Sequence, residues 1–368
     1  MKSNFEKMWD SFRLPIFAVI LGFVVGAICI IIAGSNPLVA YAALFQGSLG
    51  SVTSFGETLY KMTPIIFTGL SVALAFRCGL FNIGAEGQYI AGSIVSIATG
   101  WIFKDMPGII LIPMILIMGI IAGGIWGGIA GYLKARFGVH EVITTIMLNY
   151  IALHTSNYLV RTVLNPETLI PGSVREAFTV PIPEQAKLLK LNEILPQFTY
   201  SSAHVGIFIA IAAAIFIYFL LFKTTVGYEI RSVGFSPDAA EYGGISKEKN
   251  TILAMFIAGG LSGLAGAVQV TGLIYSVNQV AMMPGYGFTG ISVALVGVSH
   301  PLGVLASGLL FGILDNGSRQ MQLAGIPKEI TGIIQAVILI FIAGELIVKF
   351  ISERRKKELK DIKTKEVE

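Results

Sequence analysis

Residues 251–314 read TILAMFIAGGLSGLAGAVQVTGLIYSVNQVAMMPGYGFTGISVALVGVSHPLGVLASGLLFGIL, a run of 64 residues without Asp, Glu, Lys or Arg. A helix needs about 20 mostly apolar residues to cross the ~30 Å hydrocarbon layer of a bilayer. The run therefore predicts two or three membrane spans joined by very short turns. Backbone polar groups in lipid must be satisfied within the segment, so we expect these spans to be helices.

The whole composition agrees with this reading, because 54% of the 368 residues are hydrophobic and only 13% are charged. Ordinary soluble domains have about 25% charged residues. Uncharged runs also cover residues 15–33, 108–133 and 205–222. We expect an all-α transmembrane bundle of about ten spans, at residues 15–33, 62–80, 87–103, 108–132, 142–163, 204–222, 251–274, 285–299, 302–323 and 330–350.

The distribution of basic residues orients this bundle. With the N-terminus inside, 18 of the 26 Lys and Arg fall in inward-facing segments and 8 outside, as the positive-inside rule requires. Both termini should be cytoplasmic, with residues 1–350 forming the membrane domain. The charged tail 351–368 should lie against lipid headgroups. These inward charges account for the net charge of +4, so no nucleic-acid partner is indicated.

Two sequence patterns predict how the helices pack. Gly119, Gly123, Gly127 and Gly131 recur every fourth residue, and such a face of small residues lets helices approach closely in lipid. Residues 68–74 (TGLSVAL) return as residues 289–295 (TGISVAL), and each copy runs into a segment interrupted by Gly or Pro. Paired interruptions in two halves point to a transport site. The topology makes the two copies parallel repeats.

Several polar residues in or near the spans are candidates for function. Asn82 and Glu86 follow the first repeat, and an ionisable group at membrane depth is a functional hypothesis by default. Glu86 either lines a pathway or lies in a loop. His154, in the middle of the fifth span, either packs against a neighbouring helix or contacts a solute. Asp315 and Arg319, one helical turn apart, should form an ion pair.

The sequence of the loop 223–250 predicts a short helix within it. Ser236 can cap its N-terminus, Pro237 suits its first turn, residues 239–242 propagate it, and the Gly-Gly pair at 243–244 ends it. Such a well-capped element is either a docking surface or a connector between spans.

Two segments carry a resemblance to a known family. Residues 63–77 (TPIIFTGLSVALAFR) run into residues 79–88 (GLFNIGAEGQ), and residues 227–245 read GYEIRSVGFSPDAAEYGGI. The chain resembles the permeases of bacterial ABC importers in the branched-chain amino acid, ribose and nucleoside group, most closely the simple-sugar and nucleoside subgroup. Ser232 and Ser236 stand where Ala and Asn are more usual, which preserves helix capping.

The resemblance implies the following sites and partners. Asn82, Glu86 and Gln88 would lie at or near the translocation path. The contact with the ATPase subunits would be formed by Gly227, Arg231, Gly234, Pro237, Ala239, Ala240 and Gly244. The family assembles two permeases, identical or different, with two ATPase subunits and an extracellular solute-binding lipoprotein in the bacterial cytoplasmic membrane. The loop 165–203, with 39 residues and five prolines, should be ordered and help to receive that lipoprotein.

The chain itself should do no bond chemistry. It contains no G-x-x-x-x-G-K-[ST] phosphate loop, so ATP would be hydrolysed by another polypeptide. Its two cysteines support neither a disulfide framework nor a metal cluster, and we expect no catalytic residue, metal or cofactor. The resemblance implies that the function is that of a nucleoside permease, which works by alternating access powered by the separate ATPase subunits. The alternatives are a permease for ribose or another simple sugar, and an ion-coupled secondary transporter using Glu86 and His154.

Overall fold

The computed structural model describes residues 4–344, with side chains from residue 15 onward, and divides them into two compact units. One unit combines residues 4–41 with residues 321–344; the other comprises residues 42–320. The first unit holds α1 (Asn4–Ile32) and the apolar helix Glu329–Gly344. The side chains of Ile334 and Ile338 lie against Gly26 and Gly22 of α1. The charged tail 351–368 lies outside the described residues.

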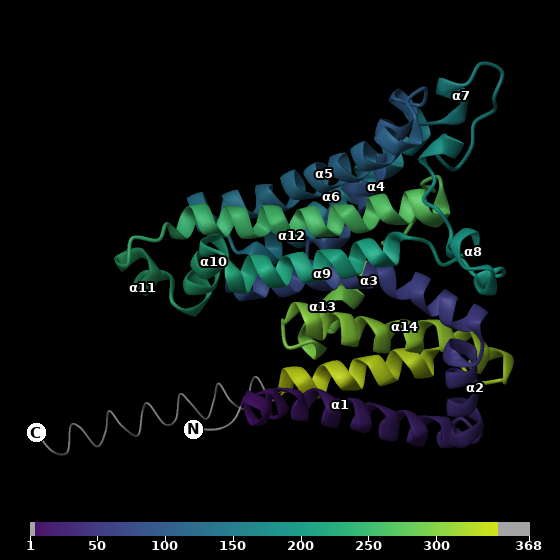
Figure 1. Cartoon of the computed structure of the whole chain (residues 1–368), viewed down its shortest axis with the longest axis vertical. Helices are drawn as coiled ribbons and strands as arrows, with labels where there is room; N and C mark the ends of the chain where they lie inside the picture. The colour runs from purple at the N-terminus through teal and green to yellow at the C-terminus, as the bar shows by residue number, and fades with distance from the viewer. Residues whose placement is uncertain (1–3, 345–368) are drawn as a thin grey trace, which may run out of the picture. The chain divides into compact units, whose positions relative to one another are not determined.

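The second unit is built almost entirely from helices (Figure 1). After α2 (Pro37–Leu49), which begins in the first unit, the elements are α3 (Val52–Arg77), α4 (Ala85–Ile102), α5 (Gly108–Phe137), α6 (Glu141–Thr162), α7 (Pro166–Leu169), η1 (Glu184–Ala186), α8 (Leu191–Ile194), η2 (Pro196–Phe198), α9 (Gly206–Lys223), α10 (Thr225–Phe235), α11 (Pro237–Tyr242), α12 (Lys247–Gln269), the π-helical η3 (Val270–Ile274), α13 (Tyr286–Val296) and α14 (Pro301–Leu323). Residues 4–344 contain two isolated β-bridges and no strand.

The all-helical prediction is confirmed over the described residues, and each of the ten predicted spans overlaps a helix. Five helical segments there are long and apolar enough to cross a bilayer. They are Pro15–Ile32, Val52–Arg77, Gly108–Phe137, Gly206–Lys223 and Lys247–Ile274. The short helices α2 and α10 were not predicted.

The uncharged run 251–314 departs from its prediction at one junction. After η3 the chain leaves the helix at Tyr275, which has a φ of +53°, and stays non-helical until Gly285, at +92°. This interval agrees with the gap between the predicted spans 251–274 and 285–299, but it is longer than the very short turn that the uncharged run suggested, because positive φ values and Pro284 prevent the helix from continuing. The next junction, between α13 and α14, is short, as predicted.

The glycine face of α5 packs on α12, which confirms its predicted role. A Cβ added at Gly123 would lie 2.3 Å from the carbonyl oxygen of Gly259, and one at Gly263 would lie 2.2 Å from that of Gly119. No side chain fits between these backbones. α5 and α12 lie side by side along much of their length (Figure 1), so the helices approach as closely as small residues allow.

The two sequence repeats lie on α3 and α13, which pack against each other in parallel. The Thr68 hydroxyl donates to the Tyr286 carbonyl at 2.9 Å, and at the other end Arg77 Nε donates to the Ser299 carbonyl at 2.8 Å. α13 has 11 residues, so at ~1.5 Å per residue it spans about half of a ~30 Å hydrocarbon layer. Its N-terminus therefore lies deep inside the bundle.

The two long loops lie at opposite ends of the second unit. α10 and α11 pack at the end reached by Arg77, whereas α7 and α8 lie at the far end (Figure 1). The loop 165–203 is ordered, as predicted: its short helices and turns pair with residues 271–279 through backbone hydrogen bonds.

Candidate functional site

A cavity of about 330 Å³ lies inside the second unit, above the N-terminus of α13. Its walls come from α3, α4, α6 and α12 and from the non-helical segment that precedes α13. The aromatic and polar residues that line it include Tyr60, Tyr89, Ser93, Ser156, Gln269 and Tyr286. Small-molecule sites have volumes of about 300–1,000 Å³ and combine apolar walls with a few polar groups. The cavity has both properties.

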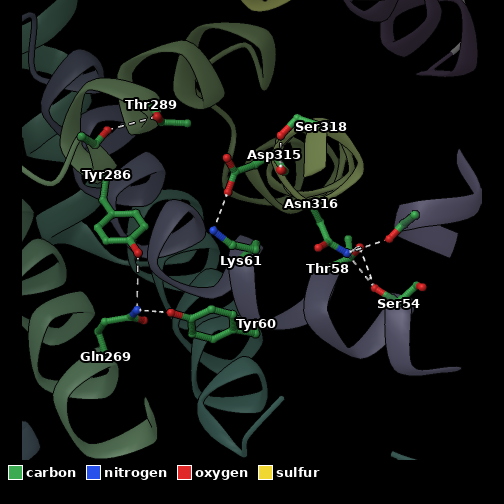
Figure 2. A network of polar contacts seen from close by, with 12 residues as sticks. Ser54, Thr58, Tyr60, Lys61, Gln269, Tyr286, Thr289, Asp315, Asn316 and Ser318 are labelled. Atoms are coloured by element: carbon green, nitrogen blue, oxygen red, sulfur yellow. Dashed lines mark hydrogen bonds and ion pairs between the residues drawn. The ribbon is translucent and has the colours of Figure 1, made fainter. Parts of the chain in front are cut away.

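One amide organises the polar part of this cavity. Gln269 Nε2 donates to the Tyr60 hydroxyl at 2.6 Å and lies 3.4 Å from the Tyr286 hydroxyl (Figure 2). The Tyr89 and Tyr286 rings lie with centroids 5.3 Å apart. Gln269 joins α12 to α3 and to α13 through these contacts. Three tyrosines and one amide thus converge from four helices.

Next to Tyr60, an ion pair fixes α3 to α14. Lys61 Nζ lies 3.1 Å from Asp315 Oδ2 (Figure 2). The pair predicted between Asp315 and Arg319 is therefore corrected, since Asp315 reaches across to α3. The neighbouring Asn316 donates to the Ser54 carbonyl at 2.9 Å and to the Thr58 hydroxyl at 3.0 Å.

Residues 275–280, which we call the roof segment, contribute Ser276, Val277, Asn278 and Val280 to the cavity wall. The outer loop holds this segment: Thr179 N donates to the Val277 carbonyl at 3.0 Å, and Ile182 N donates to the Tyr275 carbonyl at 2.8 Å. From below, Asn157 of α6 exchanges two hydrogen bonds with the Val280 backbone at 2.8 and 3.0 Å. These hydrogen bonds therefore connect the outer loop to the cavity wall through the backbone of the roof segment.

Glu86 caps the N-terminus of the short helix α13, beside the cavity residue Tyr286. Its side chain is 0% exposed, and Oε1 accepts from the backbone N–H of Gly287 at 2.8 Å and from that of Phe288 at 3.4 Å. Oε2 has no partner. A carboxylate at a helix N-terminus satisfies N–H groups that lack intrahelical partners and complements the helix dipole. Glu86 thereby ties α4 to α13 beside Tyr286.

Asn82 and Gln88 pair with each other just before and inside α4. Asn82 Nδ2 donates to Gln88 Oε1 at 2.9 Å, and Gln88 Nε2 donates back to Asn82 Oδ1 at 3.0 Å. Asn82 also donates to the Ser71 hydroxyl at 3.1 Å. Both amides are buried. This network joins α4 to the first repeat; it borders the Glu86 cap and does not line the cavity.

His154 lies apart from these groups. It is exposed on the surface of α6, although its neighbours Leu153 and Ser156 line the cavity. The structure thus brings Asn82, Glu86 and Gln88 together and leaves His154 on another face.

At the opposite end of the unit, α10 and α11 form a compact pair. The Ser236 hydroxyl accepts from Ala239 N at 3.4 Å, and α11 ends at Gly243 and Gly244, the latter with a φ of +83°. This confirms the predicted cap and stop of that helix. α10 precedes it as a second helix, capped by Thr224, which accepts from Gly227 N at 3.1 Å.

The seven candidate coupling residues divide between an inner and an outer face of this pair. A Cβ at Gly227 would lie 2.0 Å from the Leu220 carbonyl oxygen, and one at Gly234 would lie 2.1 Å from that of Arg77. Both glycines therefore press α10 against α9 and α3. Ala240 is also buried, whereas Pro237, Ala239 and Gly244 are exposed.

A cluster of cations and rings joins α10 to both repeats. The Arg231 and Arg77 guanidinium carbons lie 5.1 and 5.7 Å from the centroid of the Phe222 ring, and His300 stacks on the same ring at 5.3 Å. Arg231 Nε also donates to the Leu221 carbonyl at 3.0 Å. Burial and the Arg77 charge lower the pKa of His300, which favours a neutral ring beside two guanidinium groups.

The outer face of α10 and α11 carries exposed aromatic side chains. Phe235 is 85% exposed and Tyr242 is 97% exposed. A groove of about 640 Å³ runs between the two helices and includes Tyr228, Ser232 and Ala239. Large exposed aromatics around a groove are typical of a protein interaction site.

Comparisons with known proteins decide the family. Residues 54–343 match the model of the branched-chain amino acid transport system permease component. The chain belongs to this permease family. The matched region contains the cavity, the Glu86 cap and the α10–α11 pair of this permease.

Individual relatives extend over nearly the whole permease. It is 40% identical to a guanosine ABC transporter permease of Bacillus subtilis, covering 96% of this chain and 99% of the relative. It is 40% identical to a nucleoside ABC transporter permease of Lactococcus lactis, with 96% and 95% covered. A glucose ABC transporter permease of Haloferax volcanii is 31% identical, with 91% and 87% covered. The same Bacillus and Lactococcus strains each have a second such permease, matched at 29% and 25% identity over 75% of this chain. No solved structure matches this chain.

Sequence reasoning missed the residues that line the cavity of this permease. Tyr89 and Tyr286 lie among mostly apolar residues, where an aromatic residue is usually part of a packed core, and Tyr60 lies next to Lys61, just before the predicted span 62–80. Gln269 carried a usable signal, because an amide within an uncharged 64-residue run needs a partner at membrane depth.

Proposed function

We propose that this permease is the membrane-spanning subunit of an ATP-driven importer of nucleosides. The observation that carries the proposal is the near end-to-end identity of 40% to two permeases named for guanosine and nucleosides. The cavity supports it, because tyrosine rings and a buried amide suit an uncharged solute with a flat aromatic base. No charged side chain lines the cavity, which disfavours an ionic solute.

In the proposed topology the chain crosses the bacterial cytoplasmic membrane ten times, with residues 1–350 as the membrane domain and both termini in the cytoplasm. Arg77, Arg231 and Lys247 gather at the α10–α11 end, which suits the cytoplasmic side. The loop 165–203 then faces outward. The tail 351–368 would lie against anionic headgroups.

The α10–α11 pair is the proposed docking surface for the ATPase subunits. Exposed Phe235 and Tyr242, with Pro237, Ala239 and Gly244 between them, would contact the ATPase. Gly227, Arg231, Gly234 and Ala240 would act from the inner face by fixing α10 to the spans. ATP-driven closure of the ATPase subunits would then move α9 and both repeats together.

The remaining partners are proposed on the outer side and in the membrane. An extracellular solute-binding lipoprotein would dock on the loop 165–203. Because this loop is hydrogen-bonded to the roof segment, docking would change the cavity wall as the lipoprotein releases its solute. A second permease, related or identical, would complete the pathway. His154 would face that pathway only where the second permease covers the exposed side of α6. Asn82, Glu86 and Gln88 would border the path from within this chain.

Copurification tests the assembly. With an affinity tag placed after residue 368 and native membranes extracted in mild detergent, we expect an ATPase and a second permease in stoichiometric amounts by mass spectrometry. Recovery of the chain alone, with uptake abolished by a protonophore and insensitive to ATP depletion, would instead support an ion-coupled carrier.

A further inference from the structure

We infer that the cavity beneath the roof segment binds the nucleobase in transit, and that Gln269 reads the edge of the base. The inference rests on the proposed function and adds to it the part of the solute that is recognised and the residue that recognises it. The observation behind it is that the side-chain oxygen of Gln269, a residue of the cavity wall, has no hydrogen-bond partner.

Gln269 is 2% exposed, and its Nε2 is engaged by Tyr60 and Tyr286, yet its Oε1 has no hydrogen-bond partner. A buried acceptor without a partner is costly, and such groups in native proteins call for a specific explanation. The two tyrosine hydroxyls hold the amide in place, and Gln269 lines a cavity of ligand size. We pair its unmatched Oε1 with a donor on the bound solute.

The surroundings of this acceptor select the kind of donor. Tyr60, Tyr89 and Tyr286 all line the same cavity, and the Tyr89 and Tyr286 rings stand at 49° to each other. Two rings at that angle provide a flat face and an edge for a third aromatic group. Bases taken out of a helix are bound in this way in other proteins, with stacking on aromatic rings and hydrogen bonds to their edge. Guanine and uracil present a ring N–H on that edge, which suits Oε1.

The position of the site agrees with transit rather than permanent storage. Tyr286 is the first residue of α13, whose end lies about halfway through the layer. The roof segment, which the outer loop holds through backbone hydrogen bonds, forms part of the cavity wall. A base bound here would contact this segment and would lie beside Tyr286, the residue next to the backbone groups that Glu86 caps.

A combined change of residue and nucleoside tests the inference. The complete importer would be reconstituted in proteoliposomes with saturating binding protein. Uptake of guanosine would be compared with that of 1-methylguanosine, and uridine with 3-methyluridine, in the wild type and in Gln269→Met. Gln279, an exposed residue of the roof segment that does not line the cavity, supplies the matched control Gln279→Met. Because the binding protein is common to all arms, its own preference cancels from the ratio.

We expect the wild type and Gln279→Met to prefer the unmethylated nucleoside, and Gln269→Met to reduce that preference by about tenfold, the effect of losing one hydrogen bond of ~1.4 kcal/mol. An equal loss for both nucleosides, or a change in preference only between guanosine and 2′-deoxyguanosine, would overturn the inference. If Gln269→Met fails to assemble, Gln269→Leu, which also lacks an acceptor, replaces it under the same criterion. Failure of the wild type to carry either parent nucleoside would contradict the proposed function itself.

Discussion

At the residue scale, Glu86 joins two elements that are distant in sequence. Its Oε1 supplies the N-terminal cap that α13 lacks in its own sequence, since Gly285 has no side chain to do so. The cap holds Tyr286 in the cavity wall. The carboxylate therefore acts on the site through the position of a helix.

Replacing Glu86 separates its capping role from its charge. We expect Glu86→Ala to lower the free energy of unfolding by about 1–2 kcal/mol, the usual cost of a lost cap, and to reduce uptake strongly. Glu86→Gln keeps an acceptor oxygen and should retain most stability. Thermal unfolding in detergent and nucleoside uptake measure the two effects. Equal losses in both variants would show that charge, not capping, is what matters.

The sequence could identify Asn82, Glu86 and Gln88 as polar groups near membrane depth, but it could not supply their partners. The groups that Glu86 caps lie 201 and 202 residues away along the chain, and only the packing of α13 against α3 and α4 brings them close. The cavity tyrosines could not be told from core residues for a related reason. An aromatic ring in an apolar run looks the same whether it faces a helix or a void.

At the element scale, the contact between α5 and α12 depends on the absence of side chains. A Cβ at Gly123 would meet backbone atoms 2.3–2.7 Å away, whereas one at Gly128 would meet only the Phe256 side chain at 3.5 Å or more. Backbone cannot yield as a flexible side chain can. The periodicity of the glycines predicted this face correctly because small residues have few other uses at a regular spacing in a span.

Alanine substitutions at these two positions should therefore behave in opposite ways. We expect Gly123→Ala to destabilise the permease by about 1–3 kcal/mol through overpacking. Gly128→Ala should be neutral or slightly stabilising, since alanine favours helix over glycine by ~1 kcal/mol. Thermal stability of the purified complexes checks both. A tolerated Gly123→Ala would mean that α5 and α12 are further apart than described.

Other elements show where pattern reasoning stops. The helix α11 was predictable from Ser236, Pro237 and the Gly-Gly pair, because capping is local. The predicted spans 251–274 and 285–299 left the segment between them non-helical, but its conformation was not predictable, since hydrogen bonds to the outer loop hold it. Local sequence cannot report a conformation that a distant loop imposes.

At the scale of the whole molecule, Arg231 links the α10–α11 pair to the helices that carry the repeats. Its guanidinium lies over Phe222, the ring that Arg77 and His300 also contact. We expect Arg231→Ala to leave ATP hydrolysis by the assembled importer largely intact and to reduce the nucleoside carried per ATP several-fold. Removing the exposed positive charge of Lys249 by Lys249→Ala should leave this ratio unchanged. Unaltered coupling in Arg231→Ala would contradict the role of this cluster.

The exposed aromatics of the α10–α11 pair should contribute to assembly rather than to folding. We expect Phe235→Ala and Tyr242→Ala to weaken retention of the ATPase during copurification, each by an amount typical of an interface aromatic, above about 1 kcal/mol. The permease itself should keep its thermal stability, because both side chains face solvent. Full retention of the ATPase in the double variant would place the docking surface elsewhere.

The central claim is that this permease carries nucleosides at the expense of ATP. The most direct measurement reconstitutes the permease with its copurifying partners in proteoliposomes and follows radiolabelled guanosine, uridine and ribose after adding binding protein. The account predicts nucleoside accumulation that requires ATP on the cytoplasmic side, persists in a protonophore and exceeds that of ribose. Accumulation driven by an ion gradient without ATP, or preference for ribose, would contradict it.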